Sequence, residues 1–183
     1  MKISMKEVLR LAAGLLGLGE DSVEDGENIE QNALLLRCGN LVHDEVASEY
    51  LPPETSETVT VKDGFLPYEA LSERCSAIRL VTDANGNKVR FHARAHGASL
   101  ANGVYRVVYR YLPASVGMED NLTVDAGRLS ARVLAYGVAA EYCLLSGLFQ
   151  EAITWERKYR DSLLSICGRS TAMRLPNRRW AIG

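Results

Sequence analysis

The chain has 183 residues, of which 47% are hydrophobic and 24% are charged, and its formal net charge is −2. This length is enough to bury a core without disulfides, and the composition excludes a disordered or fibrous chain. No stretch approaches the ~20 apolar residues that cross a bilayer, so we expect a soluble protein with no membrane partner.

The charges are distributed unevenly along the chain. Residues 1–57 hold 12 acids and 4 bases (−8), residues 58–118 hold 4 and 8 (+4), and residues 119–183 hold 7 and 9 (+2). Such asymmetry favours contacts between copies, or with another protein, over the wrapping of DNA by one dominant basic face.

The cysteines and the N-terminal residues indicate in which cellular compartment the protein folds. The cysteines are Cys38, Cys75, Cys143 and Cys167. They form no C-x-x-C pair and have no histidine at zinc-ligand spacing, a pattern typical of free buried thiols in a reducing compartment. The apolar start resembles an export signal only superficially, because Lys6, Glu7 and Arg10 interrupt it. We expect an amphipathic helix there instead.

Four helices are predicted. The first covers residues 4–16, where Ser4 followed by Glu7 has the spacing of a capping box. The second covers residues 28–50 and is stopped by Pro52 and Pro53. The third runs from about residue 124 to 147 and the fourth from 149 to 167. Apolar residues of the third recur at steps of three and four, and only one or two residues separate the pair, so we expect an antiparallel helical hairpin.

Between the helix pairs the hydrophobic period changes to two, which predicts strands. The predicted strands are SETVTVKDG (56–64), CSAIRLVTD (75–83), NKVRFHARA (87–95) and GVYRVVYRYLP (103–113). Asn85-Gly86 lies between the second and third, and this dipeptide favours a type I′ hairpin turn.

The predicted fold class is therefore α+β. An antiparallel helical bundle, made of two N-terminal and two long C-terminal helices, occupies residues 1–54 and 115–168. A small antiparallel β-sheet is inserted at residues 55–114, and an extended C-terminal tail covers residues 169–183. An alternative places the sheet centrally, with the helices on one of its faces.

Patterns that carry catalysis are missing from the sequence. It has no G-x-G-x-x-G, G-x-x-x-x-G-K-[ST], G-x-S-x-G or H-E-x-x-H motif. His92 and His96 would share one strand side, but no acid or cysteine nearby completes a metal site. His43 beside Asp44 is better explained by an exposed helix face than by a general base. We expect no catalytic, cofactor-binding or metal site, no cofactor, and no enzyme activity.

Arginines and tyrosines alternate in the predicted sheet. Four arginines are candidates for inter-subunit contacts of the sheet: Arg90, Arg94, Arg106 and Arg110. Tyrosines interleaved with them are also typical of a single-strand nucleic-acid platform. Tyr105, Val107 and Tyr109 fall on the side of their strand opposite to Arg106 and Arg110, however, which favours buried rings.

The C-terminal sequence GRSTAMRLPNRRWAIG holds four arginines and no acid. A frayed terminus is the default for such a segment. The competing interpretation is a docking peptide, because Trp and Arg are enriched among interface hot spots and proline stiffens the chain. Its candidate docking residues are Arg174, Leu175, Pro176, Arg178, Arg179 and Trp180.

Several phrases resemble the head-to-tail adaptor, or connector, proteins of tailed bacteriophages. They are EVASEYLPPE, IRLVTDANGNKVRF, GVYRVVYRYLP and VLAYGVAAEYCLLSGLFQEAITWERKYRDSLL. The resemblance covers residues 28–164 and rests on helical hairpins around a β insertion.

The resemblance implies a virion protein without enzyme activity that is assembled in the host cytoplasm. Copies of the chain, commonly twelve in the family, would form a ring under the portal protein, contact the next neck or tail protein, and let double-stranded DNA pass without sequence specificity. The six tail residues would then dock on the portal or on a neighbouring subunit. Other neck or tail-completion proteins, and a nucleic-acid-binding module without sequence specificity, are the alternatives.

Overall fold

The computed structural model describes residues 2–19, 23, 28–124 and 127–167. The predicted tail at 169–183 lies outside the described residues, together with all six of its candidate docking residues. The helices are α1 (Met5–Leu15), α2 (Ile29–Glu45), the π-helical turn η3 (Val46–Tyr50), the 3₁₀ turn η4 (Tyr68–Ala70), α3 (Ala131–Leu145) and α4 (Phe149–Cys167). The strands are β1 (Glu54–Val61), β2 (Phe65–Pro67), β3 (Cys75–Thr82), β4 (His92–Arg94), β5 (Gly97–Ser99) and β6 (Gly103–Tyr111).

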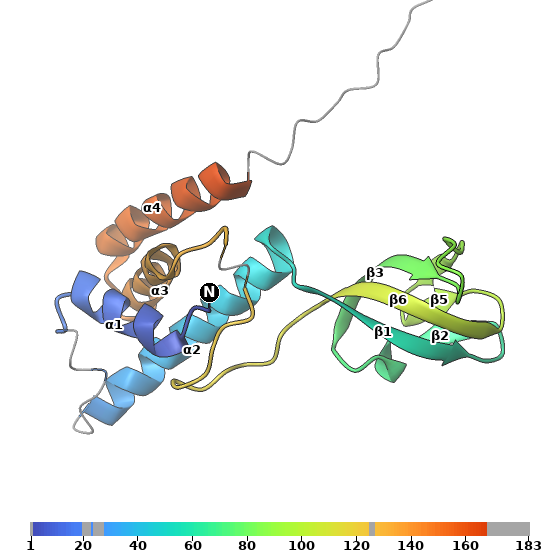
Figure 1. Ribbon diagram of the computed structural model, residues 1–183. Helices are drawn as coiled ribbons and strands as arrows, with labels where there is room; N and C mark the ends of the chain where they lie inside the picture. The colour runs from blue at the N-terminus through green and yellow to red at the C-terminus, as the bar shows by residue number, and fades with distance from the viewer. Residues whose placement is uncertain (1, 20–22, 24–27, 125–126, 168–183) are drawn as a thin grey trace, which may run out of the picture.

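Helices and strands lie in two separate parts of the molecule. In Figure 1 the chain leaves the helices after η3, forms all six strands on one side, and returns to the helices after β6. Each part has its own cluster of buried apolar side chains, one built mainly from the four helices and the other from the strands. We refer to them as the helical part and the β part.

The central helix of the helical part is α3, which contacts α1, α2 and α4. Leu134, Ala135, Val138, Ala139 and Ala140 are all buried, so this helix is covered on most of its circumference. A fully buried leucine such as Leu134 contributes roughly 1.5–3 kcal/mol relative to an exposed one. The helical part is therefore organised around α3.

The predicted antiparallel bundle with two long C-terminal helices is wrong. In Figure 1, α3 is seen nearly along its axis whereas α2 runs across the picture, so these two helices do not lie antiparallel. The physical reason is that small residues let helices approach α3 from several sides. A Cβ on Gly137 would lie 3.0 Å from both Val42 Cγ1 of α2 and Tyr159 Cε2 of α4. The predicted heptad-like spacing is that of a helix that packs along one stripe against one partner, whereas α3 packs against three helices.

The third helix is also shorter than predicted. It begins at Ala131, because the Ser130 side chain accepts a hydrogen bond from the Val133 amide and caps the helix there. The other predicted helix ends are confirmed within one or two residues. Ser4 Oγ accepts from the Glu7 amide at 3.1 Å, which is one half of the predicted capping box.

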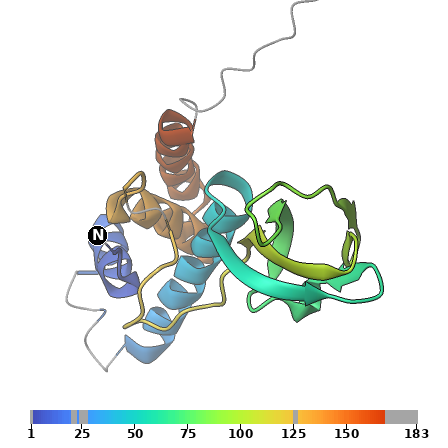
Figure 2. The same cartoon turned by 45° about the vertical axis from the view of Figure 1, so that its right-hand side comes forward.

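The strands form two three-stranded antiparallel sheets, so the prediction of one inserted sheet is wrong. The first has the order β1-β6-β3 and the second has the order β2-β5-β4. The apolar cluster of the β part contains buried side chains from both sheets, including Val107 of β6 and Leu66 of β2. Figure 2 shows the two sheets curling around this common interior.

The chain reverses at Asn85-Gly86 as predicted, with an antiparallel bridge between Thr82 and Lys88, but the turn there is not of type I′. Asp63 and Gly64 have φ values of 56° and 71°, as a type I′ turn requires, and they connect β1 to β2 through the bridge between Lys62 and Phe65. At the predicted site only Gly86 has a positive φ, and Asp83 Oδ1 instead accepts from the Asn85 and Asn87 amides. The segment after Asn87 consequently pairs with β3 only at Lys88.

Candidate interaction surfaces

The structure divides the four candidate sheet arginines between two places. Arg106 and Arg110 lie on the outer face of the first sheet, alternating with buried Tyr105, Val107 and Tyr109 as predicted. Arg94 lies on β4 of the second sheet, and Arg90 precedes that strand. The four arginines therefore do not form one surface.

On the outer face of the first sheet, Arg106 and Arg110 are joined by Arg79 of β3. Arg110 Nε lies 3.1 Å from Glu54 Oε1, and Arg79 Nε lies 3.4 Å from the same oxygen. Arg106 Nη2 donates to Ser56 Oγ at 3.0 Å. Glu54 pairs with two of these three arginines and Arg106 bonds to a neutral hydroxyl, so this group of side chains carries excess positive charge. Exposed ion pairs of this kind contribute little to stability, so these arginines can exchange their present contacts for contacts with a partner at little cost.

The histidine pair does not share a strand side. His92 lies on β4, but the strand ends at Arg94, and His96 lies in the turn before β5. Both side chains are exposed. Across the residues that the structure describes, no group of three or more histidine, cysteine, aspartate or glutamate side chains could hold a metal ion.

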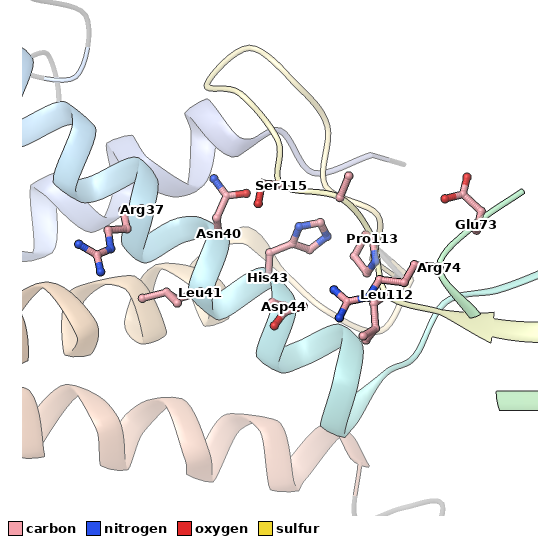
Figure 3. A pocket seen from close by; sticks show the side chains of 11 residues that line it. Arg37, Asn40, Leu41, His43, Asp44, Glu73, Arg74, Leu112, Pro113 and Ser115 are labelled. Carbon is pink, nitrogen blue, oxygen red and sulfur yellow. The ribbon is translucent and has the colours of Figure 1, made fainter. Parts of the chain in front are cut away.

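A cleft of about 610 Å³ separates the helical part from the β part. Its charged lining comes from Arg37 and Asp44 of α2 and from Glu73 and Arg74 before β3, as Figure 3 shows. His43 lines the same cleft but is buried, not exposed as the sequence suggested, and its Nε2 accepts a hydrogen bond from the Thr123 amide at 3.2 Å.

His43 and Asn40 attach the segment that follows β6 to α2. Asn40 Oδ1 accepts from the Val116 amide at 2.8 Å, while its Nδ2 donates to the Val116 carbonyl at 3.0 Å. The Thr123 amide also donates to His43, so two side chains of α2 hold the returning segment at Val116 and at Thr123. Their polar groups serve to position the backbone, so the cleft walls are structural.

Because His43 is buried as an acceptor, stability should depend on its protonation. Burial lowers the pKa of His43 below its ordinary value of 6.5 and outweighs the nearby Asp44 carboxylate, which acts to raise it. Because the Thr123 amide donates to Nε2, that nitrogen carries no proton while the hydrogen bond is formed. A lowered folded-state pKa adds stability that is present above pH 6.5 and is lost as the pH falls towards the folded value.

We therefore expect the free energy of unfolding of the unmodified chain to fall between pH 7.5 and 5.5 relative to that of His43→Gln, which keeps an acceptor but cannot titrate. The difference should change by at most about 1.4 kcal/mol per pH unit. Urea unfolding at several pH values measures it, and a constant difference would contradict the assignment of His43 as a neutral buried acceptor.

Carboxylates gather where α2, α3 and α4 meet. Tyr159 donates to Glu45 Oε2 at 3.1 Å, and burial raises the pKa of Glu45 above its usual value. Burial and the nearby Glu156 also raise the pKa of Glu141. Glu156 pairs with Arg160 one turn along α4, but among the described residues no cation pairs with Glu141. This corner of the helical part is therefore short of positive charge.

An exposed apolar surface borders these carboxylates and was missed in the sequence. It surrounds the turn between α3 and α4 and consists of Leu144, Leu145, Leu148, Phe149 and Ile153, each about half exposed or more. We call these five residues the turn patch. Part of it forms a groove in which Leu144, Phe149 and Ile153 lie beside Glu141 and Glu156.

The sequence carried a signal for the turn patch. The stretch LLSGLF places four large apolar residues around a helix connection, where polar residues are the rule. Residues at a tight turn lie at the end of the helical hairpin, where their side chains have little core to pack against.

None of the described helices is both long enough and apolar enough to cross a membrane. No protein-family model matches the chain, and no curated protein matches its sequence.

Proposed function

We propose that this chain is a structural subunit of a phage neck, which assembles into a ring that joins the portal to the tail and extends the DNA channel. The observation that carries the proposal is the turn patch, because a monomer would leave five large apolar side chains in water at one place. Contiguous exposed apolar surface of this kind is typical of a protein-protein contact. The phrases that resemble phage adaptors supply the particular assembly.

Charge distribution supports a ring. The outer face of the first sheet carries Arg79, Arg106 and Arg110 against one glutamate, whereas residues 1–57 have a net charge of −8. In a ring, different surfaces of one chain meet in every contact, so a positive face on one copy can meet acidic residues on the next. We propose such contacts for Arg106 and Arg110. Charge-reversal substitutions at these two positions test them.

The protein would act as a scaffold and not as an enzyme, with no cofactor and with about twelve copies as in the adaptor family. Double-stranded DNA would pass through the ring without sequence-specific contacts, and the C-terminal residues 174–180 would dock on the portal or on a neighbouring copy. A single-strand nucleic-acid module has less support, since Tyr105 and Tyr109 are buried and offer no ring for base stacking.

Electron micrographs of the purified chain, alone and mixed with a portal protein, test the proposal. We expect closed rings with a central channel, located between portal and tail in intact particles. A chain that stays monomeric at high concentration and with the portal would contradict it.

Deleting residues 169–183 should abolish docking while leaving the fold intact, because the buried residues of both clusters lie between Ile3 and Leu163. Ring formation in electron micrographs measures docking on a neighbouring copy, co-sedimentation measures docking on the portal, and circular dichroism verifies folding. A chain with residues 169–183 in scrambled order has the same charge and serves as the control. Docking by the truncated chain would overturn the role of this segment.

A further inference from the structure

The groove between α3 and α4 has the two properties that a basic, partly apolar peptide needs. Its apolar side is formed by Leu144, Phe149 and Ile153, which are 51%, 60% and 56% exposed. Its polar side is formed by Glu141, Glu156 and Arg160, and because Glu156 and Arg160 pair with each other, Glu141 is the acid that remains for a basic ligand. An apolar anchor and an arginine could therefore be bound within a few ångströms of each other.

Glu141 is the unsatisfied member of the groove. It is half-buried, and no cation among the described residues pairs with it. Burial and the charge of Glu156 raise its pKa above the usual value of a glutamate, since both oppose the ionised form. A guanidinium placed beside Glu141 would stabilise that ionised form and gain a charge-assisted hydrogen bond.

One segment of this chain has the complementary chemistry. Residues 168–183 contain four arginines and no acid, and among them are the apolar residues Leu175 and Trp180. Arginine and tryptophan are the residue types that most often dominate binding energy at interfaces. The segment that begins after Cys167 is 16 residues long, so when extended it spans up to roughly 50 Å.

The segment starts at the far end of the helix that carries the groove. Figure 1 shows the C-terminal end of α4 at the opposite end from the α3–α4 turn. With 19 residues, α4 is about 28 Å long. The segment is thus attached about one helix length from the groove of its own chain, and in a head-to-tail ring the groove of a neighbouring copy is a second acceptor.

We propose that the α3–α4 groove binds the C-terminal segment of a neighbouring copy, with Trp180 against Phe149 and Ile153 and an arginine beside Glu141. Each copy then inserts its C-terminal segment into one neighbour and binds the segment of the other neighbour. Every contact in the ring therefore joins two different surfaces of the chain. This inference rests on the proposed ring function and names the acceptor of the tail.

Photo-crosslinking from position 180 of the full-length chain tests the contact. Trp180 is replaced by p-benzoylphenylalanine, ¹⁵N-labelled and unlabelled chains are mixed before assembly, and the irradiated peptides are mapped by mass spectrometry. We expect mixed-isotope crosslinks to residues 141–156. Crosslinks only within one chain, or to other regions, would overturn the inference.

Two pairs of variants make the test specific. Ile153→Asp should reduce the crosslink at least tenfold, whereas Leu164→Asp, at a similarly exposed position of α4 outside the groove, should leave it unchanged. Glu141→Lys should reduce it, and Glu151→Lys, on the exposed first turn of α4, should not. Equal effects within either pair would contradict groove binding, and thermal unfolding verifies that all four variants fold.

The outcomes separate this inference from the proposed function. Rings whose position 180 crosslinks to the portal would overturn groove binding and leave the ring function standing. Mixed-isotope crosslinks to the groove in dimers or open chains, with no ring, would support groove binding and overturn the ring.

Discussion

Gly137→Leu is expected to lower the free energy of unfolding of the helical part by about 3 kcal/mol, at the upper end of the usual range for an overpacked core. A Cβ at this position would already lie 3.0 Å from Tyr159 Cε2 and from Val42 Cγ1. A leucine side chain would therefore force α2 or α4 away from α3. Urea unfolding followed by circular dichroism at 222 nm measures the loss.

The matched control is the same substitution at an exposed helical glycine. Gly14 lies in the last turn of α1 and is exposed, so Gly14→Leu should leave stability unchanged or raise it by about 0.8 kcal/mol through helix propensity. If Gly137→Leu also changed stability by less than 0.5 kcal/mol, the close crossing of three helices at Gly137 would be wrong.

Gly97→Ala is expected to separate β2 from β5 and to cost about 3 kcal/mol. The added Cβ would lie 2.3 Å from the Leu66 carbonyl oxygen and 2.5 Å from Phe65 Cζ. The phenyl ring can rotate away, but the carbonyl belongs to the backbone of the paired strand. One of the two strands must therefore move, and the buried contacts of Leu66 and Ala98 are lost with it.

Hydrogen exchange followed by mass spectrometry locates this effect. We expect faster exchange in residues 65–67 and 97–99 of Gly97→Ala, and unchanged protection in α3, because the two buried clusters are separate. Ala93→Ser, on the exposed strand β4, serves as the control. Protection lost equally in α3 would show that the two parts unfold as one unit.

Local signals predicted the helix ends well. Ser4 caps α1, Asn28 directly precedes α2, and α4 has its predicted bounds. These features depend on residues within one turn of each other, which the sequence displays directly. The start of α3 was misplaced because apolar spacing from Leu129 onward resembled an uninterrupted helix, although Ser130 is a good N-cap.

Long-range arrangement was harder to predict. Two dipeptides, Asp63-Gly64 and Asn85-Gly86, both favour a type I′ turn, and the flanking residues do not reveal which one adopts it. The division into two sheets depends on which strand pairs with His92–Arg94, and that choice is made by packing around the shared interior. The crossing at α3 likewise depends on Gly137, whose role is visible only when its three-dimensional neighbours are known.

The candidate site was predicted in part. Burial of Tyr105 and Tyr109 opposite Arg106 and Arg110 followed from strand alternation. Strand alternation gives no partner across strands, so Arg79 was not joined to this group. Arg94 lies on β4 of the other sheet and Arg90 precedes it, and the inter-subunit role of all four arginines stays a prediction. The turn patch was missed because helical spacing identifies the buried stripe of each helix and does not show which apolar residues around the turn stay exposed. The tail lies outside the described residues.

The β part joins the helices through two neighbouring strands, and this has an evolutionary consequence. Glu54 of β1 pairs with Arg110 of β6, and the Tyr111 amide donates to the Pro53 carbonyl at 3.2 Å, so the chain leaves and re-enters the helical part at almost the same point. An ancestral helical protein could have gained these strands in one insertion without moving a helix. The same attachment allows their exchange for a longer or shorter module while the helices remain the same.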